Sequence, residues 1–277
     1  MPASLPVAVA ESLRRTLAWA ALVLLPSASP LVAEGITGEI VQTFDAPCDR
    51  PAGMGFGGGS LWLVCDEATP TIYELDSTTL AEIDSFATPT ALFAFGLDHD
   101  GTNLWGDTDN PYMIYKADPA DGTVLDDFVS PHGTDATNGV VWDGTALWQT
   151  AFVRDILRVD PVTGAEIGSI PSPGESWARD MAWVQGELWV VDSNGDALDA
   201  IYRLDPADGT VLGSFQPTGG TLFFMYGLAH DGSSFWLSDI DTFEIHRLEV
   251  VVTLFADDFE SGGPCEWSAR QGADVAC

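Results

Sequence analysis

Pairs of leucine or phenylalanine with tryptophan recur along the chain at nearly constant spacing. They stand at Leu61-Trp62, Leu104-Trp105, Leu147-Trp148, Leu188-Trp189 and Phe235-Trp236. The intervals are 43, 43, 41 and 47 residues, which is typical of the blades of a β-propeller. Eight residues before each pair is a repeat position that holds Gly53, Gly96, Gly139, Asp180 or Gly227. Turns such as Asp100-Gly101 lie between this position and the Leu-Trp pair, so we predict a β-hairpin in each unit.

Two further strands follow each hairpin. A third apolar segment ends in an acidic residue, at Asp76, Asp118, Asp160, Asp205 or Glu249. In three units an Asp-Pro-x-x-Gly turn comes next, and a fourth segment reaches an apolar residue six positions after the turn glycine. Four short strands per repeat, joined by turns rich in glycine and aspartate, predict a propeller blade. The sequence therefore predicts an all-β fold.

The fifth unit lacks its own fourth strand. After Glu249 the valines continue without a turn residue, whereas residues 38–44 (GEIVQTF) repeat the glycine-to-phenylalanine spacing of a fourth strand. We therefore expect the N-terminal strand to complete the last blade, because ring closure removes the free sheet edges of an open array. The prediction is a five-bladed β-propeller of four-stranded blades over residues 34–249, with its ring closed by the N-terminal strand.

The two ends of the chain lie outside the repeats. Near the start, two arginines precede an apolar run at residues 17–25 and small residues up to Ala33, a pattern typical of a secretory signal peptide. The run is about half of the ~20 residues that a membrane span needs. We expect residues 1–33 to be removed on export, leaving an extracellular or periplasmic protein without a membrane span. Residues 250–277 form a C-terminal tail.

Four cysteines fit an oxidising compartment, where disulfides form. Two lie early and two late in the chain. Among the three possible connectivities we therefore expect Cys48–Cys65 and Cys265–Cys277, the second closing a small loop in the tail. A zinc site is the alternative, although the chain has no Cys-x-x-Cys spacing and no histidine near these cysteines.

The net charge restricts the partners. Ten Lys and Arg residues against 42 Asp and Glu residues give a formal charge of −32. Such a surface repels phosphates, which excludes nucleic acid as a partner. It suits solubility, cation binding or a saline medium. Hydrophobic residues make up 46% and aromatic residues 10% of the chain, so it is not a disordered acidic segment. We expect the folded protein to be a monomer.

The Leu-Trp, Ile-Tyr-x-Leu-Asp-Pro-x-x-Gly and Gly-x-x-x-Asp-Gly elements resemble those of secreted bacterial propellers of the YVTN, quinoprotein and Kelch-like superfamily. The resemblance covers residues 38–249. In the tail, residues 257–262 (DDFESG) and Trp267-Ser268 are similar to a short motif at the C-termini of exported bacterial proteins. The resemblance implies a propeller and export. It implies no activity, because one fold serves many functions.

One face of the predicted ring carries loops that differ in every unit. These are the loops between second and third strands and those between blades; we call this side the variable face, and the side with the Asp-Gly turns the hairpin face. In repeat proteins such loops usually carry specificity. The candidate ligand-binding residues there are Arg50, Phe95, Asn138, Arg154, Trp177, Arg179, Asp180 and Tyr226. Aromatic rings with a few polar groups suit a sugar or peptide; packing between blades and charge compensation are the alternative roles.

Four other basic residues share one repeat position near the end of the third strand. They are Lys116, Arg158, Arg203 and Arg247. We expect them to form internal ion pairs with neighbouring carboxylates.

An acidic loop in the fourth unit suggests a calcium site. It carries Asp192, Asn194, Asp196 and Asp199, whose alternating oxygen ligands suit Ca²⁺. The spacing departs from that of an EF-hand, and the alternative is a solvated acidic turn. Calcium is the one cofactor that the sequence suggests.

Catalytic motifs are missing from the chain: it has no nucleophile elbow, no phosphate-binding Walker loop and no His-Glu-x-x-His. The leading interpretation is therefore an exported binding module for a glycan or a protein. The alternative is a propeller enzyme of glycosidase-like or glutaminyl-cyclase-like type at the channel mouth; a glycosidase needs two carboxylates about 5–10 Å apart. The acid–base candidates are His132, Asp135, Glu175 and Asp180. A structural component of a matrix or filament is a third, weaker interpretation.

Overall fold

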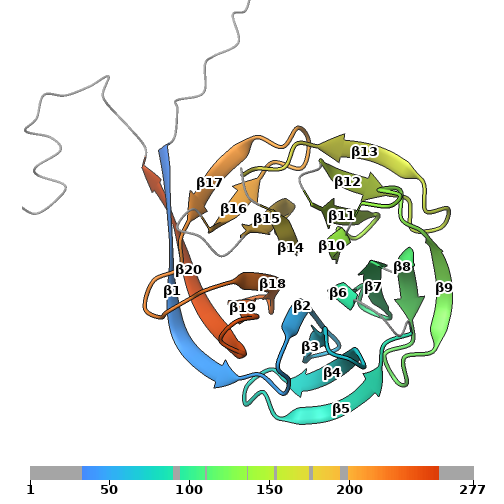
Figure 1. Cartoon of the computed structure of the whole chain (residues 1–277). Helices are drawn as coiled ribbons and strands as arrows, with labels where there is room; N and C mark the ends of the chain where they lie inside the picture. The colour runs from blue at the N-terminus through green and yellow to red at the C-terminus, as the bar shows by residue number, and fades with distance from the viewer. Residues whose placement is uncertain are drawn as a thin grey trace, which may run out of the picture. The chain divides into compact units, whose positions relative to one another are not determined.

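The computed structural model describes residues 33–89, 94–109, 111–135, 137–152, 155–174, 177–193 and 199–255. They belong to one compact unit, Val32–Phe255, and form twenty β-strands in five four-stranded antiparallel sheets. Figure 1 shows these sheets arranged as blades around a central axis. The predicted five-bladed β-propeller is therefore confirmed. Within the described ranges, the chain contains no helix that is long and apolar enough to cross a membrane.

Each blade runs from an inner strand at the axis to an outer strand at the rim (Figure 1). Blade one contains β2 (Pro51–Gly57), β3 (Ser60–Cys65), β4 (Thr71–Asp76) and β5 (Glu82–Ala87). Blade two contains β6 (Ala94–His99), β7 (Leu104–Asp109), β8 (Tyr112–Ala117) and β9 (Val124–Val129). Blade three contains β10 (Thr137–Trp142), β11 (Leu147–Ala151), β12 (Ile156–Val159) and β13 (Glu166–Ile170). Blade four contains β14 (Ala178–Val184), β15 (Glu187–Asp192), β16 (Ala200–Leu204) and β17 (Val211–Phe215). Blade five contains β18 (Met225–His230), β19 (Phe235–Asp239), β20 (Glu244–Phe255) and β1 (Ala33–Asp45).

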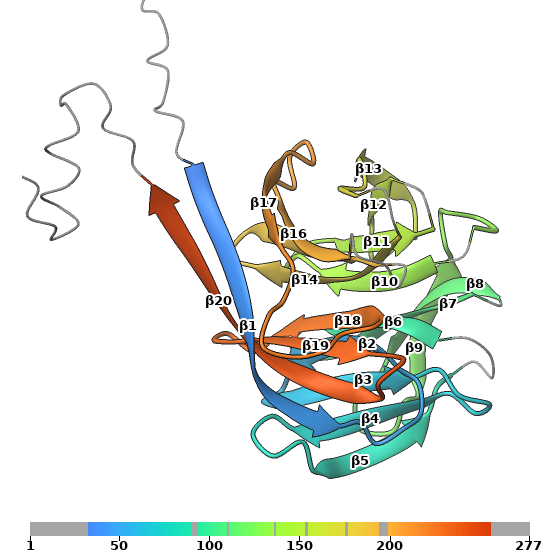
Figure 2. The same ribbon diagram turned by 60° about the vertical axis from the view of Figure 1, so that its left-hand side comes forward.

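The N-terminal strand β1 closes the ring. It pairs with β20 from Ala33 opposite Phe255 to Asp45 opposite Glu244, which gives blade five the order β1-β20-β19-β18. The predicted closure is therefore confirmed. Both strands are longer than predicted: β20 continues past Glu249 because the valines that follow favour extended backbone and no turn residue interrupts them. Figure 2 shows this pair reaching beyond the other strands of its blade.

The tryptophans of the repeat are anchored to the turns that precede them. All five are at most 4% exposed. In blades two, three and five the indole N–H donates to the aspartate five residues earlier, as Trp105 does to Asp100 Oδ2 at 2.8 Å. This bond satisfies a buried donor and ties the hairpin to the core. It explains why the Asp-Gly turn and the tryptophan keep a constant spacing.

The basic residue of the repeat stands over the tryptophan of the adjacent strand. The distances to the indole centroid are 5.3 to 6.0 Å for Lys116, Arg158, Arg203 and Arg247. The predicted ion pairs form in two blades, between Arg158 and Asp143 and between Arg203 and Glu187. For Lys116 and Arg247 the prediction is wrong, since no carboxylate in the described part of the chain lies within 4.0 Å of them. Cation–π contact with the tryptophan replaces the ion pair there.

The inner strands approach one another closely around the axis at the repeat position. A Cβ atom on Gly53 would stand 2.0 Å from the carbonyl oxygen of Phe95 in the next blade, so only glycine allows this approach. Asp180 holds the same position in blade four. Its Oδ2 accepts the backbone N–H of Met54 in blade one at 2.9 Å and that of Leu228 in blade five at 3.1 Å. The carboxylate therefore links three blades across the axis.

Candidate ligand-binding site at the centre of the variable face

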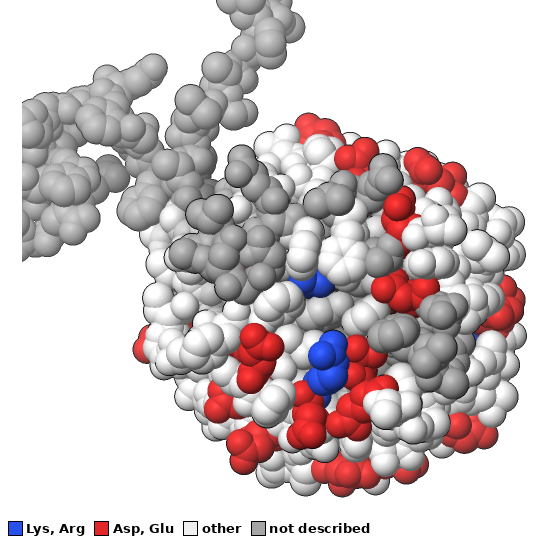
Figure 3. Space-filling model, in the orientation of Figure 1, with Lys and Arg blue, Asp and Glu red and all other residues white. Residues whose placement is uncertain are grey.

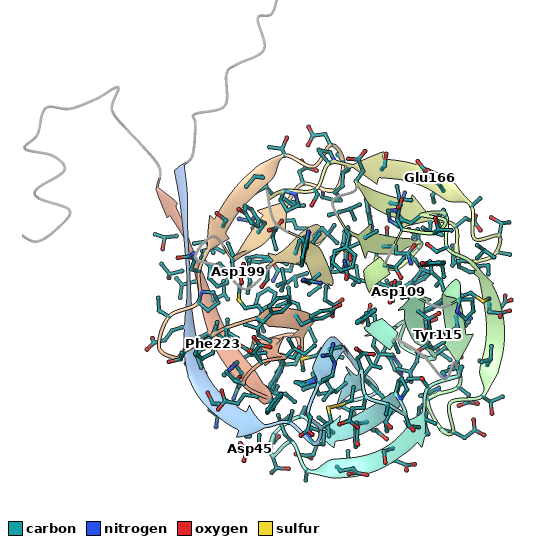
Figure 4. All side chains as sticks on the ribbon, in the orientation of Figure 1. Asp45, Asp109, Tyr115, Glu166, Asp199 and Phe223 are labelled. Carbon is teal, nitrogen blue, oxygen red and sulfur yellow. A yellow bond between two sulfur atoms is a disulfide. The ribbon has the colours of Figure 1, made fainter. Side chains whose placement is uncertain are left out.

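The variable face surrounds one mouth of the central channel. The connections β3–β4, β7–β8, β11–β12, β15–β16 and β19–β20 belong to it, together with the connections between blades. Figure 3 views this face and shows basic side chains near its centre, with acidic side chains around them. Figure 4 labels three residues of this face: Asp109 from blade two, Asp199 from blade four and Phe223 from the connection before blade five.

Arg179, on the inner strand β14, is enclosed by aromatic rings. Its guanidinium carbon lies 4.7 Å from the ring centroids of Trp177 and Phe224, 5.0 Å from that of Tyr226 and 5.1 Å from that of Phe152. The residue is only 3% exposed. Guanidinium groups stack on aromatic faces, and the attraction is largest where water is excluded. The rings thus hold a cation at the centre of the face.

The polar partners of Arg179 are neutral. Its Nε donates to the carbonyl oxygen of Ser193 at 2.9 Å, and its Nη1 donates to Asn138 Oδ1 at 3.4 Å. The Tyr226 hydroxyl donates to the same Asn138 oxygen at 3.2 Å. Among the described residues no carboxylate lies within 4.0 Å of the guanidinium, and burial lowers the pKa of Arg179. A guanidinium has five N–H donors, so donors remain for an anionic or carbonyl oxygen of a ligand.

The aromatic surface continues outward from this cage. Trp177 is 36% exposed and Phe223 is 58% exposed. Trp177 packs edge-on against Phe152 with 5.0 Å between ring centroids, and Phe95 stacks on Tyr226 at 5.8 Å. Exposed rings beside buried ones offer flat apolar area to a sugar ring or an apolar side chain.

Three carboxyl groups lie at the ends of β3 and β7, on the blade one and blade two side of the mouth. Burial raises the pKa of Asp107 to about 6 and that of Asp109 to about 6, and it also raises the pKa of Asp66. The backbone N–H of Gly96 donates to Asp107 and that of Thr137 to Asp109, both at 2.7 Å. Groups that titrate near neutral pH can exchange protons with a ligand.

A disulfide fixes the blade one part of the mouth. Cys48 in the connection before β2 is bonded to Cys65 at the end of β3, so the predicted early pair is confirmed; the predicted tail pair lies outside the described residues. Asp66, the residue after Cys65, forms an ion pair with Arg50 at 3.1 Å. Arg50 is therefore held beside a carboxylate, unlike Arg179.

The proposed acid–base residues occupy separate places. Asp180 is fully buried inside the channel, where burial raises its pKa well above the usual value. His132 and Asp135 lie in the connection before β10, and His132 Nε2 is 3.3 Å from the carbonyl oxygen of Gln149. Outside the described residues lie Glu175 and Arg154. Asp107 is as fully buried as Asp180, so the half-buried Asp109 is the titrating group that lies at the mouth itself.

The acidic loop of blade four is described only at its ends. Asp192 ends β15 and is 1% exposed, and Asp199 accepts the hydroxyl hydrogen of Ser193 at 2.5 Å. The other two predicted ligands, Asn194 and Asp196, lie outside the described residues. Within the part of the chain that is described, no three His, Cys, Asp or Glu side chains are grouped so as to hold a metal. Calcium binding stays a prediction.

Sequence interpretation missed one position that reaches the mouth in several blades. It lies four residues after the repeat tryptophan and holds Asp66, Asp109, Phe152 and Ser193 in blades one to four. The signal was present, because this is where the second strand ends on the variable face, and side chains at equivalent strand ends of a ring meet at its mouth. Alignment of the repeats beyond the Leu-Trp pair would have found it.

Comparisons with known proteins bear on the fold alone. No family model matches the chain, and no curated protein does. Among solved structures it is similar to a glutaminyl cyclase from Myxococcus xanthus, with a TM-score of 0.67 and 13% identity over 79% of this chain and 98% of that one. It also matches the computationally designed Ika8 protein, with a TM-score of 0.43 and 12% identity over 73% of this chain and 58% of that one. At 13% identity the likeness to the glutaminyl cyclase shows a shared fold and nothing about activity.

Proposed function

We propose that the protein is a binding module that holds a glycan or a protein ligand at the centre of its variable face. One observation carries the proposal: the Arg179 guanidinium lies among aromatic rings with only neutral hydrogen-bond partners in the described chain. Asp192 and Asp199 act on this charge only at longer range, and a buried charge that lacks a direct ion pair costs stability. A ligand carboxylate or carbonyl oxygen would complete its hydrogen bonding, while the exposed ring of Trp177 packs on the apolar part of the ligand.

Array screening followed by calorimetry tests this function. The purified protein is applied to arrays of neutral oligosaccharides, uronate-containing oligosaccharides and peptides, and bound compounds are then titrated in solution. We expect the retained compounds to lose about tenfold or more in affinity with Arg179→Gln and with Trp177→Ala, because a central contact of this kind is worth about 2 kcal/mol. Arg158→Gln is the matched control, since Arg158 stacks on a tryptophan of the same fold away from the mouth. The proposal is rejected if Arg179→Gln and Trp177→Ala bind the compounds as tightly as the control Arg158→Gln does. It is also rejected if no compound on any array is bound.

An enzymatic alternative is supported by the carboxyl groups of the mouth. Asp107 and Asp109, with pKa values of about 6, lie within electrostatic range of Tyr226, as does Arg179. In a glutaminyl-cyclase-like reaction the α-amine of an N-terminal glutamine attacks its γ-carboxamide carbon, a C–N bond forms, and ammonia leaves. A carboxylate of suitable pKa would take the proton from the amine and deliver it to the departing ammonia.

Ammonia release from a peptide with N-terminal glutamine tests this alternative. Activity that falls at least a hundredfold with Asp109→Asn and persists with the exposed-site variant Asp126→Asn would support it. No ammonia above the rate without protein would reject it. A glycosidase-like role requires two carboxylates that flank one substrate bond, and hydrolysis of array oligosaccharides is the corresponding assay.

We also propose that the protein is exported and belongs to the secreted propeller superfamily that its repeats resemble. The Cys48–Cys65 disulfide supports export, because disulfides persist in oxidising compartments. Sequencing of the N-terminus of protein recovered from the medium or periplasm tests it, with Glu34 as the expected first residue. Recovery of the protein only from the cytoplasm, with residues 1–33 intact, would contradict it.

A further inference from the structure

A cavity lies at the other mouth of the channel, on the hairpin face. Its volume is about 120 Å³. The side chains around it come from the inner strands of all five blades and include Phe56, Asp98, His99, Trp142, Trp183 and His230. Five of these six are aromatic or imidazole groups, and aliphatic side chains complete the lining. This cavity is separate from the arginine site of the variable face.

Asp98 is the one carboxylate that lines this cavity. It lies two residues after the repeat position of its blade, where the other blades have Gly55, Val141, Ala182 and Ala229. One oxygen, Oδ2, accepts the backbone N–H of Trp142 at 2.7 Å. A Cβ atom on Gly55 would stand 2.6 Å from Asp98 Cα, so glycine in the neighbouring blade makes room beside it.

No cation among the lining residues compensates the charge of Asp98. The two histidines use Nδ1 to accept a backbone N–H, His99 from Gly101 at 2.9 Å and His230 from Gly232 at 3.2 Å. Burial lowers the pKa of both histidines, so they are neutral above pH 7. Burial also raises the pKa of Asp98 to about 7, as expected of a carboxylate that lacks a positive partner.

We propose that this cavity binds a small monovalent cation of the ammonium or methylammonium class, held by the Asp98 carboxylate. An ammonium group donates hydrogen bonds to a carboxylate, and aromatic rings around it add cation–π attraction. The cavity has room for such an ion together with a few waters, since one water occupies about 30 Å³ in the liquid. The net charge of −32 raises the local concentration of cations. A divalent metal fits less well, because the described residues provide no group of three ligands.

Thermal unfolding and calorimetry at pH 8 test the proposal on the full mature chain. The probes are ammonium chloride and methylammonium chloride, and sodium chloride at equal ionic strength measures screening alone. We expect a melting temperature that rises with either ammonium salt and saturates, and a larger rise than sodium chloride gives. Asp98→Asn removes the charge and keeps an oxygen that can accept from Trp142, so it should lower the affinity about tenfold or more.

Asp126→Asn is the matched control, because it removes the same charge from an exposed position on β9 of the same blade. It should keep the ammonium response of the original protein. Equal shifts in ammonium and sodium salts, together with no heat of binding, would overturn the proposal. So would an ammonium response that persists in Asp98→Asn. Because the variable face plays no part in this test, its outcome is independent of the ligand proposed there.

Discussion

Ring closure by β1 leads to a prediction that single residues can test. Ile40 and Val41 are neighbours on this strand at an interruption of its pairing with β20, and they differ in burial: Ile40 is 8% exposed, whereas Val41 is 39% exposed. Ile40 packs in a core cluster with Phe215 of blade four and Leu248 of β20. We predict that Ile40→Ala destabilises the protein strongly and that Val41→Ala does not.

The magnitude follows from the burial of each side chain. Truncating a buried isoleucine to alanine costs about 2–5 kcal/mol, because transfer energy is lost and a cavity remains. The same truncation at a surface position costs about 0.5 kcal/mol. Deleting residues 34–44 removes the burial of Ile36, Ile40 and half-buried Phe44, at about 1.5–3 kcal/mol each. The sum is comparable to the whole stability of a typical domain, about 5–15 kcal/mol, and the deletion also exposes the edge of β20.

Urea unfolding followed by tryptophan fluorescence measures both substitutions, and sedimentation of the soluble fraction measures the deletion. We expect the free energy of unfolding to fall by at least about 1.5 kcal/mol more for Ile40→Ala than for Val41→Ala, and the deleted protein to aggregate. The reasoning fails if the two substitutions have equal effects, or if the deletion variant is soluble and melts at the temperature of the intact mature protein.

Three other outcomes are expected. Burial raises the pKa of Asp98 from 3.8 to about 7 and that of Asp107 to about 6, so the folded state binds more protons than the unfolded state at these two groups. Their contribution to stability should fall by about 1.4 kcal/mol per pH unit and group, from about pH 4 to 7 for Asp98 and from about pH 4 to 6 for Asp107. The stability difference in urea between the original protein and Asp98→Asn should therefore change with pH over the first of these ranges. Replacing Cys48 and Cys65 by serine opens a loop closed over a separation of 17 residues and should lower the free energy of unfolding by about 3 kcal/mol, whereas an unchanged melting temperature under reducing conditions would count against this. Calcium at the blade four loop should raise the melting temperature more than sodium at equal ionic strength does, and Asp192→Ala should remove the difference; equal responses would leave a solvated acidic turn.

The repeat made the fold predictable because each of its residues serves a geometric need. The glycine at the repeat position lets inner strands approach, and the Asp-Gly turn supplies the acceptor for the indole N–H. Residues 38–44 were recognisable as the missing strand because they keep the spacing of the outer strands. Proximity in sequence was enough to predict Cys48–Cys65. These features are local, and a linear sequence displays them.

The sites were harder to predict because they depend on which blades face one another. Phe152 and Phe224 belong to blade three and to the connection before blade five, yet both stand over Arg179 of blade four. Lys116 was expected to meet a carboxylate. The register places it between Trp105 on β7 and Asp126 on β9, and its amine stands over the Trp105 ring. Asp98 is inconspicuous in the sequence, and its role depends on a cavity that exists only when five strands meet at the axis.

Asp180 separates the two mouths of the channel. Along β14, Arg179 faces the aromatic cage, Ala182 lines the opposite cavity, and Asp180 lies between them with its carboxylate on the N–H groups of Met54 and Leu228. A glycine at this position would leave those two inward N–H groups without this acceptor, at a cost of about 1–3 kcal/mol each if they stayed buried and unpaired. The aspartate therefore stabilises the centre of the ring and divides it. The ligand proposed for the arginine site carries an anionic or carbonyl oxygen and the ligand proposed for the Asp98 cavity is a cation, so the two proposals predict ligands of different charge on the two sides of Asp180.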